Sequence, residues 1–91
     1  MRNRFRRDQL PDPATYYEQE GLKFRGTGEW KSTTCPFHPD HRPSLRVRLE
    51  SGSFWCPVCG EKGGDVLAFH QKKYGQDFKE AAKALGAWER S

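Results

Sequence analysis

The chain has 91 residues, 34% of them hydrophobic and 31% charged, which leaves room for one small domain whose core alone gives marginal stability. No apolar run approaches the ~18 residues of a membrane span, and the arginine-rich start lacks the apolar stretch of a secretory signal. We therefore expect neither a membrane protein nor a secreted protein. The three cysteines therefore indicate a metal site in a reducing cytoplasm rather than a disulfide framework.

Positive charge predominates, with sixteen Lys and Arg against twelve Asp and Glu and a formal net charge of +4. This balance favours a polyanionic partner such as nucleic acid. Four arginines crowd the first seven residues, where no apolar periodicity is present. We expect residues 1–11 to form a basic flexible arm and residues 12–91 to form the folded domain.

A short helix should follow this arm. Asp12 suits the N-cap of the helix, Pro13 its first turn and Gly21 its end. After Gly21 the apolar period changes to two. This change predicts a strand hairpin over residues 22–33, with its turn at residues 26–28.

The clearest alternation of apolar and polar residues runs over 44–49. Three aliphatic side chains of this strand should face the core, while Arg46 and Arg48 face outward. Another strand is expected over residues 53–56. A glycine-rich bend over residues 60–64 follows it.

Two helices should complete the domain. Asp65 is placed to cap a helix over residues 66–74, and Asp77 and Glu80 are spaced as the capping box of a last helix. Trp88 is expected to extend the apolar stripe of that last helix. Together the elements predict an α+β fold, in which short helices flank a small antiparallel sheet.

Two pairs of metal-binding residue types share one internal spacing. Two residues separate Cys35 from His38, and two separate Cys56 from Cys59. Zinc prefers thiolate and imidazole ligands, and four of them close a tetrahedron, so the ion would be structural rather than catalytic. Its binding energy then becomes folding energy, which stabilises the small core. His41 is the alternative fourth ligand, although the spacing of the second pair favours His38.

Five short motifs stand in a fixed order along the chain: CPFH (35–38), RPSL (42–45), FWCPVCG (54–60), GGDV (63–66) and FKEAA (78–82). In this order and spacing they resemble the N-terminal zinc-binding domain of bacterial and phage DnaG-type DNA primases. The resemblance extends over about residues 14–87. It implies a zinc-ribbon fold with one structural Zn²⁺ and a sheet that contacts single-stranded template DNA.

The polymerising domain of such primases, with its metal-binding carboxylates, has no counterpart in the motifs. We therefore expect no catalytic residue, no enzyme activity and no small-molecule substrate in this chain. The resemblance implies a separate catalytic primase or polymerase domain or subunit as partner, or a helicase. The chain would be either a module of a longer primase or a free-standing relative.

The residues themselves suggest a binding face on the sheet. Arg46 and Arg48 project from one strand, Trp55 is out of phase with its buried neighbour, and Lys31 and Lys62 would extend the basic surface. In the alternative interpretation the arginines serve only solubility, and Trp30 or Trp55 covers the core.

A competing function is that of a protein-interaction module. Zinc-ribbon surfaces also dock protein partners, so a free-standing copy could recruit a replication partner on a mobile element. Binding of short single-stranded oligonucleotides by the isolated chain discriminates between the two hypotheses.

Overall fold

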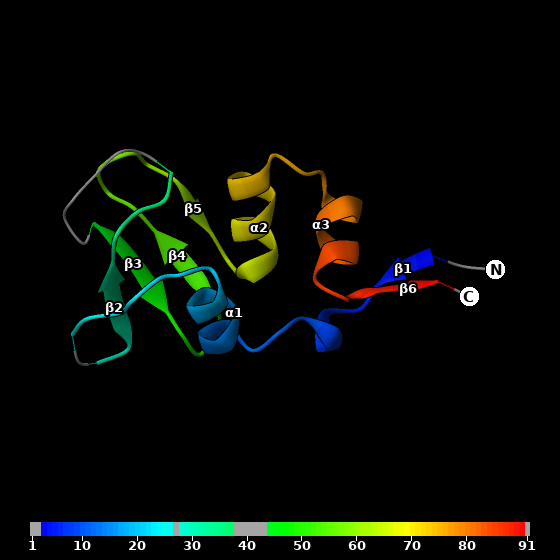
Figure 1. Cartoon of the computed structure of the whole chain (residues 1–91), viewed down its shortest axis with the longest axis horizontal. Coiled ribbons are helices and arrows are strands. Elements are labelled where there is room, and N and C mark those ends of the chain that lie inside the picture. Colours follow the sequence, from blue (N-terminus) through cyan, green and yellow to red (C-terminus); the bar gives the residue numbers. More distant parts are fainter. Residues whose placement is uncertain (1–2, 27, 38–43, 91) are drawn as a thin grey trace.

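The computed structural model describes residues 3–26, 28–37 and 44–90. In chain order its elements are β1 (Asn3–Phe5), the 3-10 turn η1 (Arg7–Gln9), α1 (Pro13–Gln19), β2 (Trp30–Thr33), β3 (Leu45–Arg48), β4 (Ser53–Trp55), β5 (Lys62–Gly63), α2 (Val66–Tyr74), α3 (Phe78–Ala84) and β6 (Trp88–Arg90). The molecule is elongated, measuring 46 × 25 × 18 Å. The sheet formed by β2 to β5 lies at one end and the strands β1 and β6 at the other, with α2 between them (Figure 1).

An antiparallel sheet of four strands, in the order β2-β3-β4-β5, carries most of the chain's pairing. The strands predicted over 44–49 and 53–56 are confirmed by β3 and β4. Leu45 and Val47 are fully buried beneath β3, as the alternation indicated. The glycine-rich bend at 60–64 contains β5, a short edge strand that pairs with β4.

The first strand of the predicted hairpin is not formed. Arg25 makes an isolated bridge to Ser32, with N···O distances of 2.8 and 2.9 Å, and no longer ladder precedes it. The N–H of Leu22 instead donates to the carbonyl of Tyr17 and closes the end of α1. Leu22 and Phe24 still pack against the core, so the period of two predicted burial correctly but not strand pairing.

Each α-helix begins at an aspartate whose side chain accepts the backbone N–H of the residue three positions on: Asp12, Asp65 and Asp77. These caps confirm the predicted helix starts. The prediction for Trp88 was wrong, because Gly86 turns the chain at φ 76° and Trp88 begins β6 instead of extending α3. None of the helices in the described part of the chain is long and apolar enough to cross a membrane.

Phe69 of α2 stands at the centre of an aromatic core. Its ring meets Tyr17, Phe54 and Tyr16 edge to face, at centroid distances of 4.9, 5.4 and 6.0 Å. Phe37 adds a tilted contact at 5.2 Å. These rings come from α1, α2, β4 and the loop after β2, so one cluster joins both helices to the inner face of the sheet.

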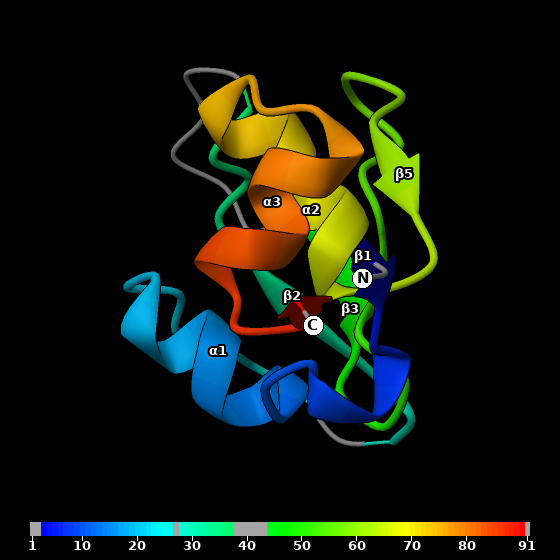
Figure 2. The ribbon, with the colours of Figure 1, turned by 90° about the vertical axis from the view of Figure 1, so that its right-hand side faces the viewer.

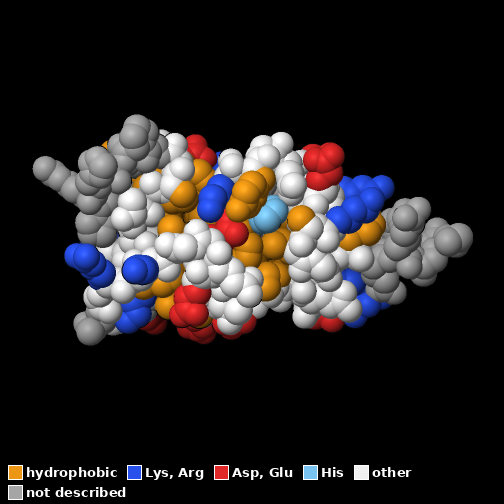
Figure 3. All heavy atoms as spheres, in the orientation of Figure 1, with side chains coloured by type: hydrophobic (Ala, Val, Ile, Leu, Met, Phe, Trp, Pro, Cys, Tyr) orange, Lys and Arg blue, Asp and Glu red, His pale blue; other side chains and the backbone are white. Residues whose placement is uncertain are grey.

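Polar side chains join α1 to α2 beside this core. The hydroxyl of Tyr16 lies 2.7 Å from Nδ1 of His70, and Glu20 accepts hydrogen bonds from Lys73 at 2.9 Å and Tyr74 at 2.6 Å. Burial lowers the pKa of His70. Figure 3 shows a histidine among hydrophobic side chains in the middle of this face.

Within the segment 1–11, which the sequence predicts to be a basic flexible arm, described residues contact the rest of the chain. Asn3–Phe5 pairs with Trp88–Arg90, the ring of Phe5 meets Phe78 edge to face at 5.0 Å, and Arg7 forms a 2.8 Å ion pair with Asp65. β1 and β6 consequently lie side by side (Figure 1) and next to each other in the second view (Figure 2). Local periodicity could not reveal this pairing, because the partner strand is more than eighty residues away in the sequence.

Candidate metal centre and nucleic-acid interface

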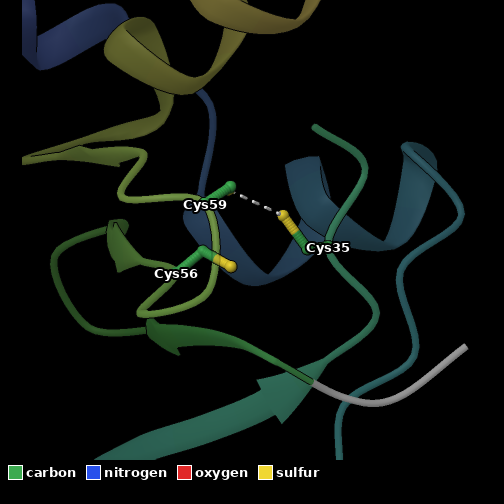
Figure 4. A group of neighbouring side chains, drawn as sticks. All are labelled: Cys35, Cys56 and Cys59. Carbon is green, nitrogen blue, oxygen red and sulfur yellow. Dashed lines mark hydrogen bonds between the residues drawn. The ribbon is translucent and has the colours of Figure 1, made fainter. Parts of the chain in front are cut away.

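The three cysteines converge from two separate loops. Cys35 follows β2, whereas Cys56 follows β4 directly and Cys59 lies in the turn after it (Figure 4). Their three Sγ atoms all lie within 4.8 Å of one another, and the Sγ atoms of Cys35 and Cys59 are 3.7 Å apart. The sheet therefore brings together sulfur atoms that are distant in the sequence.

The turn between Cys56 and Cys59 is held by backbone hydrogen bonds. The N–H of Gly60 donates to the carbonyl of Cys56 at 2.8 Å, and the N–H of Cys56 donates to the carbonyl of Glu61 at 2.8 Å. Gly60 has φ 79°, a left-handed conformation that glycine adopts without steric cost. A glycine directly after the second cysteine pair thus lets the turn aim both thiols at one centre.

The environment of the thiols fits a bound cation. Cys35 and Cys56 are buried and Cys59 is exposed. Burial, with the neighbouring thiols of Cys56 and Cys59 adding to it, raises the pKa of Cys35 to about 12. Three ionised sulfurs this close together need a compensating positive charge, and thiolate ligands at such spacing suit zinc. The chain therefore holds one structural zinc ion.

Both candidates for the fourth ligand, His38 and His41, lie in the segment 38–43, outside the described residues. The assignment of His38 rather than His41 accordingly stays a prediction. His70 is distant from this question, because its ring lies between α1 and α2 and contacts Tyr16.

Phe37 ties the first metal-binding turn to the core. Its ring is 5.8 Å from that of Phe54 and 5.2 Å from that of Phe69. No role for Phe37 was predicted from the sequence. Its place in the CPFH motif was the available signal, because a large apolar residue close to a buried cysteine ligand such as Cys35 is expected to pack against the core.

One row of side chains crosses the outer face of the sheet. Register pairs place Ser32 opposite Arg46, Arg46 opposite Trp55, and Trp55 opposite Lys62. Directly opposed residues of antiparallel strands share a face. Arg46, Trp55 and Lys62 are all exposed, so three of the predicted contacts stand together on the face opposite the core.

Arg48 shares this outer face, but acidic side chains surround it. It stands opposite Trp30 on β2, and its Nη2 lies 3.7 Å from Glu29 and 3.4 Å from Glu50. No carboxylate among residues 3–26, 28–37 and 44–90 forms such an ion pair with Arg46. Arg46 is therefore the more available cation of the two.

Lys31 does not join the row. It stands opposite the buried Val47, and so belongs to the inner face of the sheet. Its Nζ donates to the carbonyl of Gly26 at 3.1 Å, within the turn before β2.

Trp30 lies on the outer face and does not cover the core, which was the alternative that the sequence left open. It is 42% exposed and Trp55 is 49% exposed. A groove of about 500 Å³ lies between them, lined by Trp30, Arg46, Trp55 and Pro57. The residues of β2, Trp-Lys-Ser-Thr, show no apolar alternation. The sequence therefore did not indicate which of them face outward.

Comparison with known proteins identifies the family. A profile of the CHC2 zinc finger, the zinc ribbon of DnaG, matches residues 18–89. The DNA primase of Mycolicibacterium smegmatis is 51% identical over 51 residues, covering 56% of this chain and 8% of the primase. That of Mycoplasma pneumoniae is 38% identical over 73 residues, covering 79% of this chain and 12% of the primase.

A solved structure shows the same fold. The crystal structure of the Aquifex aeolicus primase, comprising zinc-binding and RNA polymerase domains, superposes with a TM-score of 0.69 at 33% identity. The superposition covers 84% of this chain and 18% of that one. The chain thus spans a small fraction of the primases it matches. Its profile match, its cysteine cluster and its fold agree, and the chain belongs to the CHC2 zinc-finger family, the zinc-binding domain of DnaG-type DNA primases.

Proposed function

We propose that the outer face of the four-stranded sheet binds single-stranded template DNA. The observation that supports this most is the row of Arg46, Trp55 and Lys62 across three neighbouring strands. Single strands are held by cations along the phosphate backbone and by aromatic rings that stack on bases. This row offers both kinds of contact on a face that the core does not use.

The chemistry of priming is assigned to another domain or subunit. The Aquifex aeolicus chain that this fold matches contains an RNA polymerase domain in addition to its zinc-binding domain. In our proposal the present chain supplies the template contact, and a catalytic primase or polymerase domain or subunit makes the primer, with a helicase as a further partner. The setting is the cytoplasm of a bacterial or phage-infected cell, as suits relatives that are bacterial DNA primases.

In this proposal zinc supports DNA binding indirectly, by maintaining the conformation of the sheet. Trp55 directly precedes Cys56, and Pro57 follows it within the metal-binding turn. A metal ion that fixes the conformation of this turn therefore also fixes the position of Trp55 and Pro57 at one end of the outer face. When bound, the ion supplies structural cross-linking of the two loops, and the side chains of the sheet make the contacts to DNA.

Two charge-matched double variants test the proposal. Arg46→Ala with Lys62→Ala removes two cations from the outer face. Lys23→Ala with Lys31→Ala also removes two cations, but Lys31 belongs to the inner face and Lys23 lies in the segment after α1. Both variants have the same net charge, so any difference between them reports position. Binding of a short fluorescent single-stranded oligonucleotide is measured by anisotropy over a range of salt concentrations, after zinc content is confirmed.

The first variant should bind more weakly, by on the order of tenfold per lost phosphate contact at ~50 mM salt. Its plot of log K against log salt should flatten by about 1.4, since each phosphate contact on a single strand contributes about 0.7 to the slope. The control variant should keep most of the slope. Equal loss in both variants, or no binding by the zinc-loaded parent chain at low salt, would contradict the proposal.

A further inference from the structure

We propose that the groove between Trp30 and Trp55 binds a single unstacked nucleobase, and that Arg46 selects guanine there. This inference rests on the proposed function, because it specifies what one point of the outer face recognises. It concerns base identity, whereas the proposed function requires only cationic and stacking contacts.

The groove has room for an aromatic plane. Trp30 of β2 and Trp55 of β4 stand on either side of β3 and are offset by two residues along the strands. Two strand spacings combined with that offset place their backbones roughly 12 Å apart. The two indoles therefore flank the groove instead of packing on each other. Pro57 adds an apolar edge, and the open groove has a volume of about 500 Å³.

The exposure of the two tryptophans also needs a reason. Both indoles are more than two-fifths exposed, although this small chain has few large apolar side chains with which to build a core. Residues directly beside them on the inner face, such as Phe54 and Val47, are buried and complete the core without them. Exposed indole rings beside a cation form the kind of platform on which bases of a single strand stack.

Arg46 of β3 stands opposite Trp55 and diagonal to Trp30, and it is the polar residue of the groove. Its Nη1 donates to Oγ of Ser32 at 3.3 Å, which steadies the guanidinium over β2 and β3. Within the part of the chain that the structure describes, no carboxylate neutralises Arg46, in contrast to Arg48 beside Glu29 and Glu50. The remaining N–H donors of Arg46 can therefore face a ligand.

The donor pattern of Arg46 favours guanine over the other bases. A guanidinium donates two parallel hydrogen bonds, and guanine presents the adjacent acceptors O6 and N7. Adenine offers a donor beside its N7, and thymine offers one acceptor beside a methyl group. Cytosine has two adjacent acceptors on its Watson–Crick edge but a smaller ring to stack, so it should rank second.

The test uses zinc-loaded protein and four short oligothymidylates that differ at one central position: guanine, cytosine, thymine or an abasic site. The guanine strand should bind about tenfold more tightly than the thymine strand, and the abasic strand most weakly. Arg46→Lys should remove the guanine preference while keeping the salt dependence, because lysine keeps the charge without the bidentate donors. Trp30→Ala should weaken binding of all strands with a base at that position by roughly tenfold, and Trp30→Phe should restore part of the loss.

Tryptophan fluorescence gives a second readout. Stacking should quench the parent protein on addition of the guanine strand, and Trp30→Phe should quench less. The same ranking in the matching RNA strands would support the groove, since the contacts use the base alone. Tight binding of all four strands with equal affinity, insensitive to Trp30→Ala, would overturn this inference and leave the proposed function standing. Failure of every strand to bind would overturn the proposed function itself.

Discussion

Gly63 gives the most direct test of how the sheet packs against α2. A Cβ added at Gly63 would lie 2.6 Å from Cε1 of Phe54 and 2.7 Å from both Cζ of Phe54 and the Cβ of Ala68. A Cβ added at the neighbouring Gly64 would meet nothing within 4 Å. Gly63→Ala and Gly64→Ala therefore make the same chemical change, one inside a packed contact and one in open space.

The expected free-energy difference follows from those distances. Carbon atoms in ordinary contact stand about 3.5–4.0 Å apart, so Phe54 or α2 must move by roughly 1 Å to admit the new methyl group. Phe54 is 2% exposed and has little room to move. Overpacking of this kind costs about 1–3 kcal/mol, and replacement of glycine by alanine returns about 0.4–1 kcal/mol through the unfolded chain. Gly63→Ala should lose about 1–2 kcal/mol of unfolding free energy, while Gly64→Ala should be neutral or slightly stabilising.

Urea unfolding followed by far-UV circular dichroism measures both variants. Each is compared with the parent at the same saturating free zinc concentration, because bound metal adds to the apparent stability. A loss of 1 kcal/mol should also lower the thermal midpoint by roughly 4–8 °C in a domain of this size. If Gly63→Ala is as stable as Gly64→Ala, the packing of β5 against Phe54 and α2 described here is wrong.

Three further predictions concern a buried hydrogen bond, the α1–α2 contact and the fourth zinc ligand. Tyr17→Phe removes the donor to the carbonyl of Gly52, a buried 2.6 Å hydrogen bond, and should cost about 1–3 kcal/mol in urea unfolding without changing zinc content. His70 has a lowered pKa in the fold, so unfolding exposes a better proton acceptor, and stability should fall as pH drops from about 6.5 towards that lowered value. His70→Gln should show a shallower decline over the same window at fixed zinc, and an identical decline would refute this role. His38→Ala should abolish tight zinc binding in a competition titration while His41→Ala retains it, and the reverse result would assign His41 as the ligand.

Structural features that depend on residues close together in the sequence were predictable from the sequence. The aspartates before α1, α2 and α3 act on backbone groups three residues away, so their capping role is visible without a fold. The alternation over β3 placed Leu45 and Val47 in the core because a half-buried strand repeats every two residues. The equal spacing of the two metal-binding pairs likewise predicted three sulfurs that the structure brings together.

Features that depend on pairing between distant segments were not predictable in this way. The strand β1 forms by pairing with β6, and the arginine-rich segment around it gave no sign of a strand in the sequence alone. The face of β2 is set by its register with β3, and the residue of β2 that becomes buried is the polar Thr33. Lys31 therefore falls on the inner face and Trp30 on the outer one, which is why the groove beside Arg46 could be recognised only in three dimensions.

The central claim is that zinc maintains the sheet whose outer face binds the template and makes no contact of its own with it. The most direct measurement is a chelator titration of the zinc-loaded chain in which released zinc, far-UV circular dichroism and anisotropy of a labelled single strand are followed together. We predict one coincident transition in all three signals, reversed when zinc is restored. Binding that persists after the metal has left would contradict the claim, as would a sheet that stays folded while binding is lost.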